Sequence, residues 1–193
     1  MNIGIFGGTF NPPHMGHLIV IESIRDQSQF DKILFIPSSQ PPNKRDPSIA
    51  SAMHRLTMTQ LAVRDNPDFE VSDIEIQRGG VSYSIDTVNA FVSTNPKASL
   101  SLILGVDNLI EFPTWKSPKE ILAKADLVVM SRPGFDQQHI KNEFARLSKF
   151  VHVPPVGISG TEIRRRIKMG RSIRYLVPKA VEDYILSHGL YRD

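Results

Sequence analysis

The chain has 193 residues, of which 40% are hydrophobic and 22% charged, and its formal net charge is +3. These fractions exclude a disordered chain, and the length is enough for one domain that buries roughly 70% of the surface of its unfolded form. The apolar runs are too short to cross a bilayer, the start lacks the pattern of a secretory signal, and cysteine is absent, which excludes disulfides and thiolate metal sites. We therefore expect a cytoplasmic protein with a single domain over residues 1–193.

Strand-like apolar runs alternate with segments of helical periodicity along the whole chain. Extended segments are expected at residues 3–6, 32–37, 69–77, 99–105, 126–130 and 150–155. Helices are expected at residues 16–29, 51–63, 84–94, 117–125, 138–148, 161–169 and 179–188. The alternation predicts an α/β fold with a doubly wound parallel sheet, followed by a small helical part at the end of the chain. In such sheets, ligands bind beyond the carboxyl ends of the strands.

Several of the expected helices carry residues that are typical of helix ends. Two Ser–Glu pairs have the spacing of a capping box, and two glycines follow the last two helices. These residues are Ser117 with Glu120, Ser159 with Glu162, Gly170 and Gly189. In the helix at 51–63, the spacing places Met53, Leu56, Gln60 and Leu61 on one face.

The stretch GGTFNPPHMGH, residues 7–17, directly follows the first expected strand. Gly7 and Gly8 would let the chain leave the strand tightly and let a ligand approach backbone N–H groups. His14 and His17 can lie on the same side of the helix that begins here, and a helix N-terminus favours an anion. The alternatives are histidines in ordinary structural roles, or a pair of metal ligands, for which no third ligand of obvious spacing follows. Neither GxxxxGK[ST] nor GxGxxG is present.

The tetrapeptide HMGH at 14–17 resembles the HxGH signature of nucleotidyltransferases, which transfer a nucleoside monophosphate from a triphosphate to a phosphate acceptor. A second stretch, ISGTEIR at 158–164, resembles the late ISxxxIR motif of the same superfamily. The residue chemistry agrees, because Arg164 lies one turn into a helix and can donate two N–H groups to a phosphate. The expected catalytic residues are therefore His14, His17 and Arg164.

A phosphate acceptor explains why no general base is evident in the sequence. The second pKa of a phosphate monoester is about 6, so the acceptor is largely ionised at neutral pH. Catalysis would then consist of positioning and of stabilising charge on the α-phosphate and the departing pyrophosphate. Mg²⁺ is expected to accompany ATP and to be held by its phosphates, with no metal ligand from protein side chains.

Four further stretches resemble the nicotinate-nucleotide adenylyltransferases, and the match runs nearly end to end. They are PSSQPPNK at 37–44, SYSIDT at 82–87, GVDNLIEFPTWK at 105–116 and YLVPKAVEDYI at 175–185. The resemblance implies transfer of the adenylyl group of ATP to nicotinate mononucleotide, giving deamido-NAD and pyrophosphate in NAD biosynthesis. The ATP-binding residues that it implies are Gly7, Gly8, Thr9, Phe10, Gly105, Asp107, Ile158 and Ser159. For the acceptor, it implies Lys44, Tyr83, Ser84, Asp107 and Trp115.

The resemblance also assigns roles to these acceptor residues. Trp115 would stack on the pyridine ring, while Tyr83 and Ser84 would bind its carboxylate. Lys44 would meet the acceptor phosphate, and Asp107 would bind a ribose hydroxyl. Structural alternatives stay open, since Trp115 could be a half-buried core residue and Asp107 a helix cap.

The chain departs from the family pattern at three positions. The family often has Asp, His and Ser or Thr where this chain has Asn11, Asn43 and Gly160. Asn11 removes a negative charge beside the phosphates that a metal or water contact could have used. Gly160 removes a hydroxyl from the triphosphate site but leaves its N–H available. These departures bear on affinity and metal handling more than on the type of reaction.

Other functions account for parts of the sequence. The acceptor could be nicotinamide mononucleotide or phosphopantetheine, although Trp115 and SYSIDT favour a pyridine ring. A non-catalytic nucleotide-binding regulator would not need groups aimed at a leaving pyrophosphate. An RNA-binding protein using the basic run at 164–171 lacks aromatic stacking residues nearby. We therefore expect ATP and nicotinate mononucleotide as partners, without nucleic acid or a membrane, and leave a homo-oligomer open.

Overall fold

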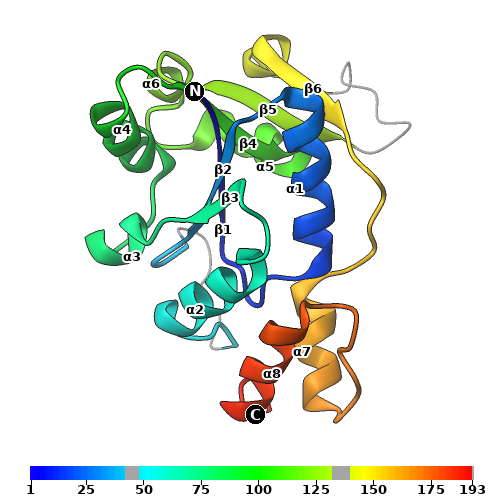
Figure 1. Cartoon of the computed structure of the whole chain (residues 1–193). Helices are drawn as coiled ribbons and strands as arrows, with labels where there is room; N and C mark the ends of the chain where they lie inside the picture. The colour runs from blue at the N-terminus through cyan, green and yellow to red at the C-terminus, as the bar shows by residue number, and fades with distance from the viewer. Residues whose placement is uncertain (42–47, 132–139, 193) are drawn as a thin grey trace.

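Six parallel strands form one sheet, with helices on both of its faces (Figure 1). This computed structural model describes residues 1–41, 48–131 and 140–192. The strand order is β3-β2-β1-β4-β5-β6. The order in which the chain adds strands to the sheet reverses between β1 and β4. The doubly wound parallel α/β sheet that the sequence predicts is therefore confirmed. The strands are β1 (Asn2–Gly8), β2 (Lys32–Pro37), β3 (Phe69–Val71), β4 (Ser99–Gly105), β5 (Asp126–Ser131) and β6 (Ser148–His152).

The helices connect the strands and then form a separate group after β6. Those between the strands are α1 (Met15–Ser28), α2 (Ala52–Val63), α3 (Ile74–Arg78), α4 (Ser84–Thr94), α5 (Val106–Glu111) and α6 (Pro118–Leu122), with the 3₁₀ helices η1 (Phe112–Thr114) and η3 (Glu143–Leu147). After β6 come α7 (Gly160–Lys168) and α8 (Lys179–Ser187). None of the described helices is long and apolar enough to cross a membrane.

Each face of the sheet has its own apolar cluster, as expected for a parallel sheet covered on both sides. Ile3 and Ile5 of β1 belong to the cluster that packs against α4, α5 and α6. Phe6 belongs to the cluster on the other face, which includes Ile21 and Ile24 of α1. The two isoleucines of α1 are fully buried, so packing holds the N-terminus of α1 at the carboxyl end of β1.

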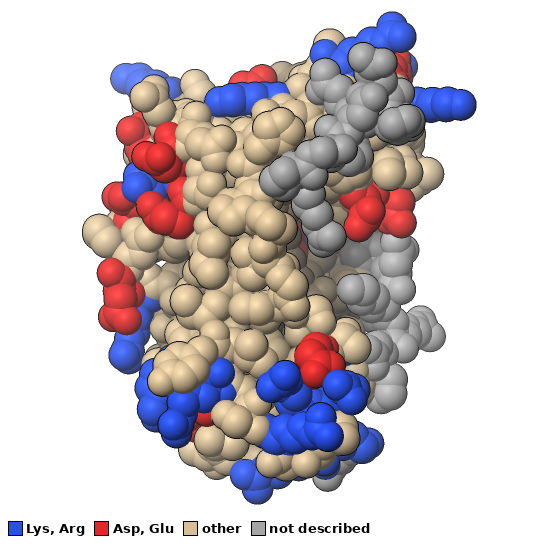
Figure 2. Space-filling view, turned by 90° about the vertical axis from the view of Figure 1, so that its right-hand side faces the viewer, with Lys and Arg blue, Asp and Glu red and all other residues tan. Residues whose placement is uncertain are grey.

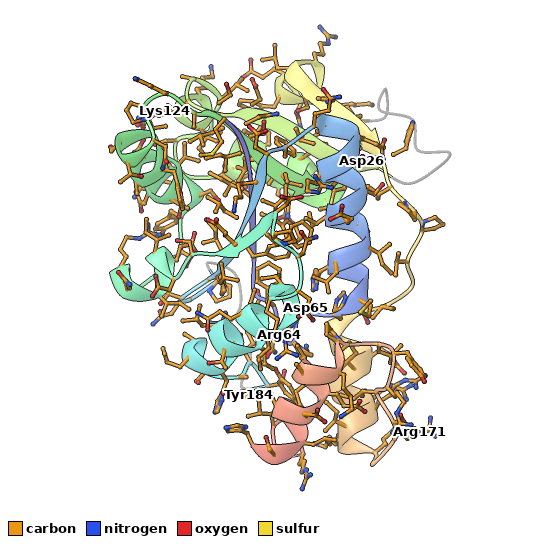
Figure 3. All side chains as sticks on the ribbon, in the orientation of Figure 1. Asp26, Arg64, Asp65, Lys124, Arg171 and Tyr184 are labelled. Carbon is orange, nitrogen blue, oxygen red and sulfur yellow. The ribbon has the colours of Figure 1, made fainter. Side chains whose placement is uncertain are left out.

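A third cluster joins α7 and α8 to α2 at the carboxyl edge of the sheet. Ile163 of α7, Val181 and Ile185 of α8, and Met58 of α2 are buried together. Tyr184 of α8 points toward α2 (Figure 3), and its hydroxyl lies 2.9 Å from Nδ1 of His54. Figure 1 shows α7 and α8 below the sheet, close to the point where β1 leads into α1. The helical part is thereby fixed beside the strand ends where a ligand is expected.

The segment at 69–77, expected to be extended, forms a short strand and then a helix. β3 ends at Val71, and α3 begins at Ile74, so the prediction is wrong for the second half. Asp73 explains the change, because its carbonyl and carboxylate accept hydrogen bonds from the N–H and the side chain of Gln77, each 2.8 Å long. Local bonds of this kind compete with a strand ladder, especially at the edge of a sheet.

Two of the predicted helices differ from the prediction, one in how its start is capped and the other in its type. Ser117 precedes α6, but its φ is 53° and its side chain makes no capping bond. Glu120 instead pairs with Lys124 at 2.7 Å, so the capping box predicted there is wrong. The helix predicted at 138–148 is, in its described part, the 3₁₀ helix η3. Its first two residues lie outside the described part of the chain.

Candidate active site

A cavity of about 460 Å³ lies at the carboxyl end of β1, between the N-termini of α1 and α7. Its walls come from the loop after β1, from the start of α1 and from the first turn of α7. The cavity is lined by Thr9, Phe10, Asn11, Pro12, His14, His17, Ile49, Gly160, Thr161 and Arg164. The structure therefore brings together the three residues predicted to be catalytic, although about 150 residues separate the histidines from the arginine.

The two histidines at the start of α1 stack on one another. Their ring centroids are 3.6 Å apart and their planes differ by 22°. The backbone N–H of His14 donates a hydrogen bond to Nδ1 of His17 over 3.2 Å. A neutral imidazole whose Nδ1 accepts must carry its proton on Nε2. His17 is therefore held in the tautomer whose Nε2–H can donate to an anion in the cavity.

Burial keeps both histidines neutral in the free protein. The pKa of His14 is lowered to about 4 because the ring is buried. The pKa of His17 is lowered to about 3 by burial and, secondarily, by the neighbouring His14. The Nδ1 atom of His14 is itself buried without a hydrogen-bond partner among the described residues. At neutral pH the pair thus supplies neutral donors from largely buried positions, where hydrogen bonds to charge are strong.

These lowered pKa values predict a specific loss of stability in acid. Histidines in the unfolded chain take up protons below about pH 6.5, whereas the buried pair does not, so the free energy of unfolding falls as the pH drops toward about 4. Between about pH 7.5 and pH 5 the loss is on the order of 1–2 kcal/mol for each histidine. We expect urea unfolding of the double variant His14→Asn/His17→Asn to show a correspondingly smaller loss between these pH values. An equal loss in both proteins would contradict the burial of the pair.

Gly16 lies between the histidines at a point where a side chain would crowd the His14 ring. A Cβ at this position would come within 3.0 Å of Nδ1 of His14 and 3.4 Å of a methyl group of Val156. The absence of a side chain therefore allows His14 to stack on His17.

We expect Gly16→Ala to lower turnover about 10-fold or more, because it displaces the His14 ring, and small displacements of positioned groups are costly. The fold should be retained, since alanine favours a helix. Gly157→Ala is the matched control, because a Cβ there meets nothing within 4 Å. Steady-state kinetics and circular dichroism of both variants provide the test. Normal turnover of Gly16→Ala would show that the His14 ring position is not critical.

Arg164 reaches the cavity from one turn into α7. Its Nη1 donates a hydrogen bond of 2.8 Å to the backbone carbonyl of Asn11. This contact needs close packing of α7 against the loop, since a Cβ at Gly160 would lie 2.9 Å from the Asn11 carbonyl oxygen. Gly160 thus has a packing role here, in addition to removing the hydroxyl that the family often carries. Ser159 caps α7 by accepting from the N–H of Glu162 over 3.2 Å.

The capping box predicted for α7 is only half formed. The carboxylate of Glu162 binds Arg165 at 2.8 Å and Arg166 at 3.1 Å instead of turning back to the backbone of Ser159. Both arginines are thereby held along the outer side of α7. Figure 2 shows the basic side chains gathered at the lower end of the molecule.

The Asn11 side chain binds other protein groups within the pocket wall. Oδ1 accepts from the N–H of Ala50 at 3.0 Å and from the hydroxyl of Tyr191 at 2.7 Å. Nδ2 donates to the carbonyl of Ser48 at 3.2 Å. The residue is 8% exposed. Asn11 therefore joins three separate segments, a structural role that sequence reasoning did not foresee.

Sequence reasoning also missed Arg55, which is 1% exposed. Its guanidinium donates to the carbonyl oxygens of Thr9, Ser39 and Ala50, at 2.9, 2.9 and 3.0 Å. Arg55 thus ties the loop after β1 to the loop after β2 and to the start of α2. The predicted face of α2 is wrong at Met53, which is 61% exposed, and at Gln60, which is also exposed. Met58 and Thr59 are instead buried, as is Arg55. The spacing of 55, 58 and 59 is the signal that could have identified this face.

The remaining predicted ATP-binding residues lie at the same edge of the sheet but do not all line this cavity. Thr9 and Phe10 line it, and Ile158 and Ser159 directly precede α7. Gly7 and Gly8 are still paired with β2, so the expectation that they form the exit from the strand is wrong by two residues. Gly105 ends β4 and Asp107 is exposed in the first turn of α5, outside the cavity lining.

Two of the predicted acceptor residues lie at the start of α4, and Asp107 lies after the end of β4. Tyr83 and Ser84 start α4, which is positioned by a 2.9 Å bond from the N–H of Ser39 to Oγ of Ser82. Nζ of Lys116 lies 4.7 Å from the centre of the Tyr83 ring. Lys116, which follows Trp115 in the sequence, therefore lies over the start of α4.

Trp115 is half-buried and packs against Phe112, with ring centroids 5.3 Å apart. The core role considered for Trp115 is therefore present in the structure, and its pyridine-stacking role stays a prediction. Lys44 and Asn43 lie outside the described residues.

No group of three or more His, Cys, Asp or Glu side chains that could hold a metal ion occurs within residues 1–41, 48–131 and 140–192. The described lining of the cavity likewise contains no carboxylate. The groups that face a ligand there are neutral or cationic donors, which suits a polyanion.

A parallel sheet of this order, with an HxGH histidine pair and an arginine of a later helix on one anion cavity, defines a nucleotidyltransferase of the α/β class. Residues 5–166 match the family model described as cytidylyltransferase-like. Two relatives, from Salinibacter ruber and Thermus thermophilus, are each named probable nicotinate-nucleotide adenylyltransferase. Each is 43% identical over 192 residues, covering all of this chain and 98% and 100% of the respective relative. The chain therefore belongs to the nicotinate-nucleotide adenylyltransferase family.

Solved structures show the same fold. A nicotinic acid mononucleotide adenylyltransferase from Plasmodium falciparum complexed with NaAD is 19% identical, with a TM-score of 0.77, covering 98% of this chain and 97% of that one. A putative nicotinate-nucleotide adenylyltransferase from Vibrio parahaemolyticus is 23% identical, with a TM-score of 0.71, covering 100% and 96%. At these sequence identities, the similarity to the two solved structures concerns the fold alone.

Proposed function

We propose that this protein transfers the adenylyl group of ATP to nicotinate mononucleotide, giving deamido-NAD and pyrophosphate. The observation that carries the proposal is the convergence of His14, His17 and Arg164 on one cavity between two helix N-termini. Two imidazoles, a guanidinium and two helix N-termini suit the phosphates of a nucleoside triphosphate. The family membership of the whole chain supplies the class of acceptor.

Each group has a defined part in the proposed mechanism. The acceptor phosphate attacks the α-phosphorus in its ionised form, so no side chain has to remove a proton. Nε2–H of His17 donates to an oxygen whose charge grows in the transition state, and His14 supports the ring by stacking. Arg164 binds the phosphates that leave as pyrophosphate, while the Asn11 carbonyl holds its guanidinium in place.

The acceptor site is proposed to lie at the start of α4. Tyr83 and Ser84 would bind the pyridine carboxylate, aided by free N–H groups in the first helical turn. Trp115 would stack on the ring, and Lys44 would bind the acceptor phosphate. Gly105 would let adenine approach the backbone, and Asp107 would bind a ribose hydroxyl.

Mg²⁺ is proposed to enter with ATP, bound through phosphate oxygens. When bound, it would neutralise charge on the phosphates. We also propose that residues 1–193 act as one nucleotidyltransferase domain. The cytoplasmic location stays a prediction, and the oligomeric state stays open.

Pyrophosphate release from Mg-ATP tests this function, with nicotinate mononucleotide, nicotinamide mononucleotide and phosphopantetheine offered separately. We expect release with nicotinate mononucleotide at a kcat/KM at least about 10-fold above that of the other two. Preference for the amide would refute the assignment of the acceptor, and no release with any of them would refute the enzymatic function.

A further inference from the structure

The chain turns back toward the phosphate cavity after α8. Gly189 ends the helix with a φ of 62°, and the N–H of Leu190 returns to the carbonyl of Ile185 at 3.1 Å. Tyr191 follows with a φ of 65°, in the left-handed region that non-glycine residues seldom adopt. A residue held in this conformation needs support from its surroundings.

The support comes from the loop after β1. The hydroxyl of Tyr191 donates a hydrogen bond of 2.7 Å to Oδ1 of Asn11, across 180 positions of sequence. The side chain also lines a second cavity of about 420 Å³, which shares Ile49, Thr161 and Arg164 with the phosphate cavity. Burial raises the pKa of the phenol above its ordinary value, so the hydroxyl stays protonated and able to donate.

Asn11, which accepts the hydrogen bond from Tyr191, also accepts one from Arg164. The carbonyl of Asn11, whose side chain accepts from the phenol, accepts from Nη1 of Arg164 at 2.8 Å. The orientation of this peptide group therefore helps to set where the guanidinium lies relative to the cavity, together with the Thr161 hydroxyl, which lies 3.5 Å from Nη2. Two further bonds, to Ser48 and Ala50, hold the Asn11 side chain against the start of α2.

We propose that Tyr191 is a positioning residue for adenylyl transfer, which acts through Asn11 to fix the guanidinium of Arg164 against the substrate phosphates. The inference rests on the proposed function and adds a residue from the segment after α8 to the working site. Tyr191 touches no reacting atom. Its effect should therefore appear in the rate of the chemical step rather than in binding of the acceptor.

The test is the variant Tyr191→Phe, which keeps the ring and removes only the hydroxyl. Tyr184→Phe is the matched control, because Tyr184 lies on the preceding helix and its hydroxyl binds His54 outside the site. We expect Tyr191→Phe to lower kcat about 10-fold, with the KM of the acceptor unchanged within about twofold and the melting temperature close to that of the wild type. Tyr184→Phe should keep the wild-type kcat.

A double-mutant cycle shows whether the effect passes through Asn11. In an Asn11→Ala background, Tyr191→Phe should have no further effect on kcat, because its partner is gone. Independent, multiplicative effects would overturn the inference, and so would a wild-type kcat for Tyr191→Phe in an active enzyme. A wild-type protein that releases no pyrophosphate with any acceptor would instead overturn the proposed function on which the inference rests.

Discussion

Replacing His17 with alanine should lower kcat by about 100- to 1000-fold, the usual effect of removing one donor to transition-state charge. The fold should survive, because the ring lines a cavity and its Nδ1 only accepts a hydrogen bond from the backbone N–H of His14. We expect KM for the acceptor to change little. Steady-state kinetics and thermal unfolding of the purified variant measure both effects.

A glutamine at this position separates two roles of His17. The amide nitrogen of glutamine can take the place of Nε2 and donate, but it cannot shuttle a proton at neutral pH. If His17 acts as a neutral donor, His17→Gln should retain clearly more activity than His17→Ala. His188→Ala is the control, since this histidine is exposed directly after α8, where its ring stacks on Tyr184 and lines neither cavity. Equal and complete loss in both His17 variants would point to proton transfer instead.

Replacing Arg164 with methionine should have an effect of similar size but of a different kind. We expect kcat/KM for ATP to fall by about 100- to 1000-fold, because the two-pronged donor to the departing phosphates is lost. Arg164→Lys should recover only part of this loss, since a point charge cannot reproduce the planar fork. Kinetics over a range of ATP concentrations, with an unfolding curve for each variant, provide the measurement.

Arg171→Met serves as the control for charge alone. Arg171 is exposed and points away from the body of the molecule (Figure 3). The substitution removes a positive charge from the same end of the protein without touching the cavity. A loss of activity equal to that of Arg164→Met would mean that net charge, and not the position of Arg164, attracts ATP.

Much of the fold could be predicted because periodicity and caps act locally. The segments at 32–37, 84–94 and 99–105 form elements with the predicted bounds. Ser159 was recognised as a helix start for the same reason, because its bond to Glu162 spans three residues. The α3 helix was missed, since a five-residue helix beside an edge strand has too short a pattern to be distinguished from an extended segment.

The contacts that complete the site depend on distant parts of the chain. Arg55 is buried only because carbonyl oxygens of three separate segments surround it, and an arginine is rarely buried otherwise. The bond between Asn11 and Tyr191 joins residues near the two ends of the sequence. No local pattern encodes such a pairing. The three residues predicted to be catalytic could be named because two separate motifs carry them, and the fold shows how these motifs meet at one cavity, while their catalytic roles stay predictions.

The transfer of a labelled α-phosphate tests the proposed reaction most directly. The wild-type protein would be incubated with nicotinate mononucleotide and ATP carrying radioactive phosphorus at the α or at the γ position. We predict that the α label appears in the dinucleotide product and the γ label in pyrophosphate. Label from the γ position in the acceptor would mean phosphoryl instead of adenylyl transfer, and would contradict the proposed arrangement of ATP along His17 and Arg164.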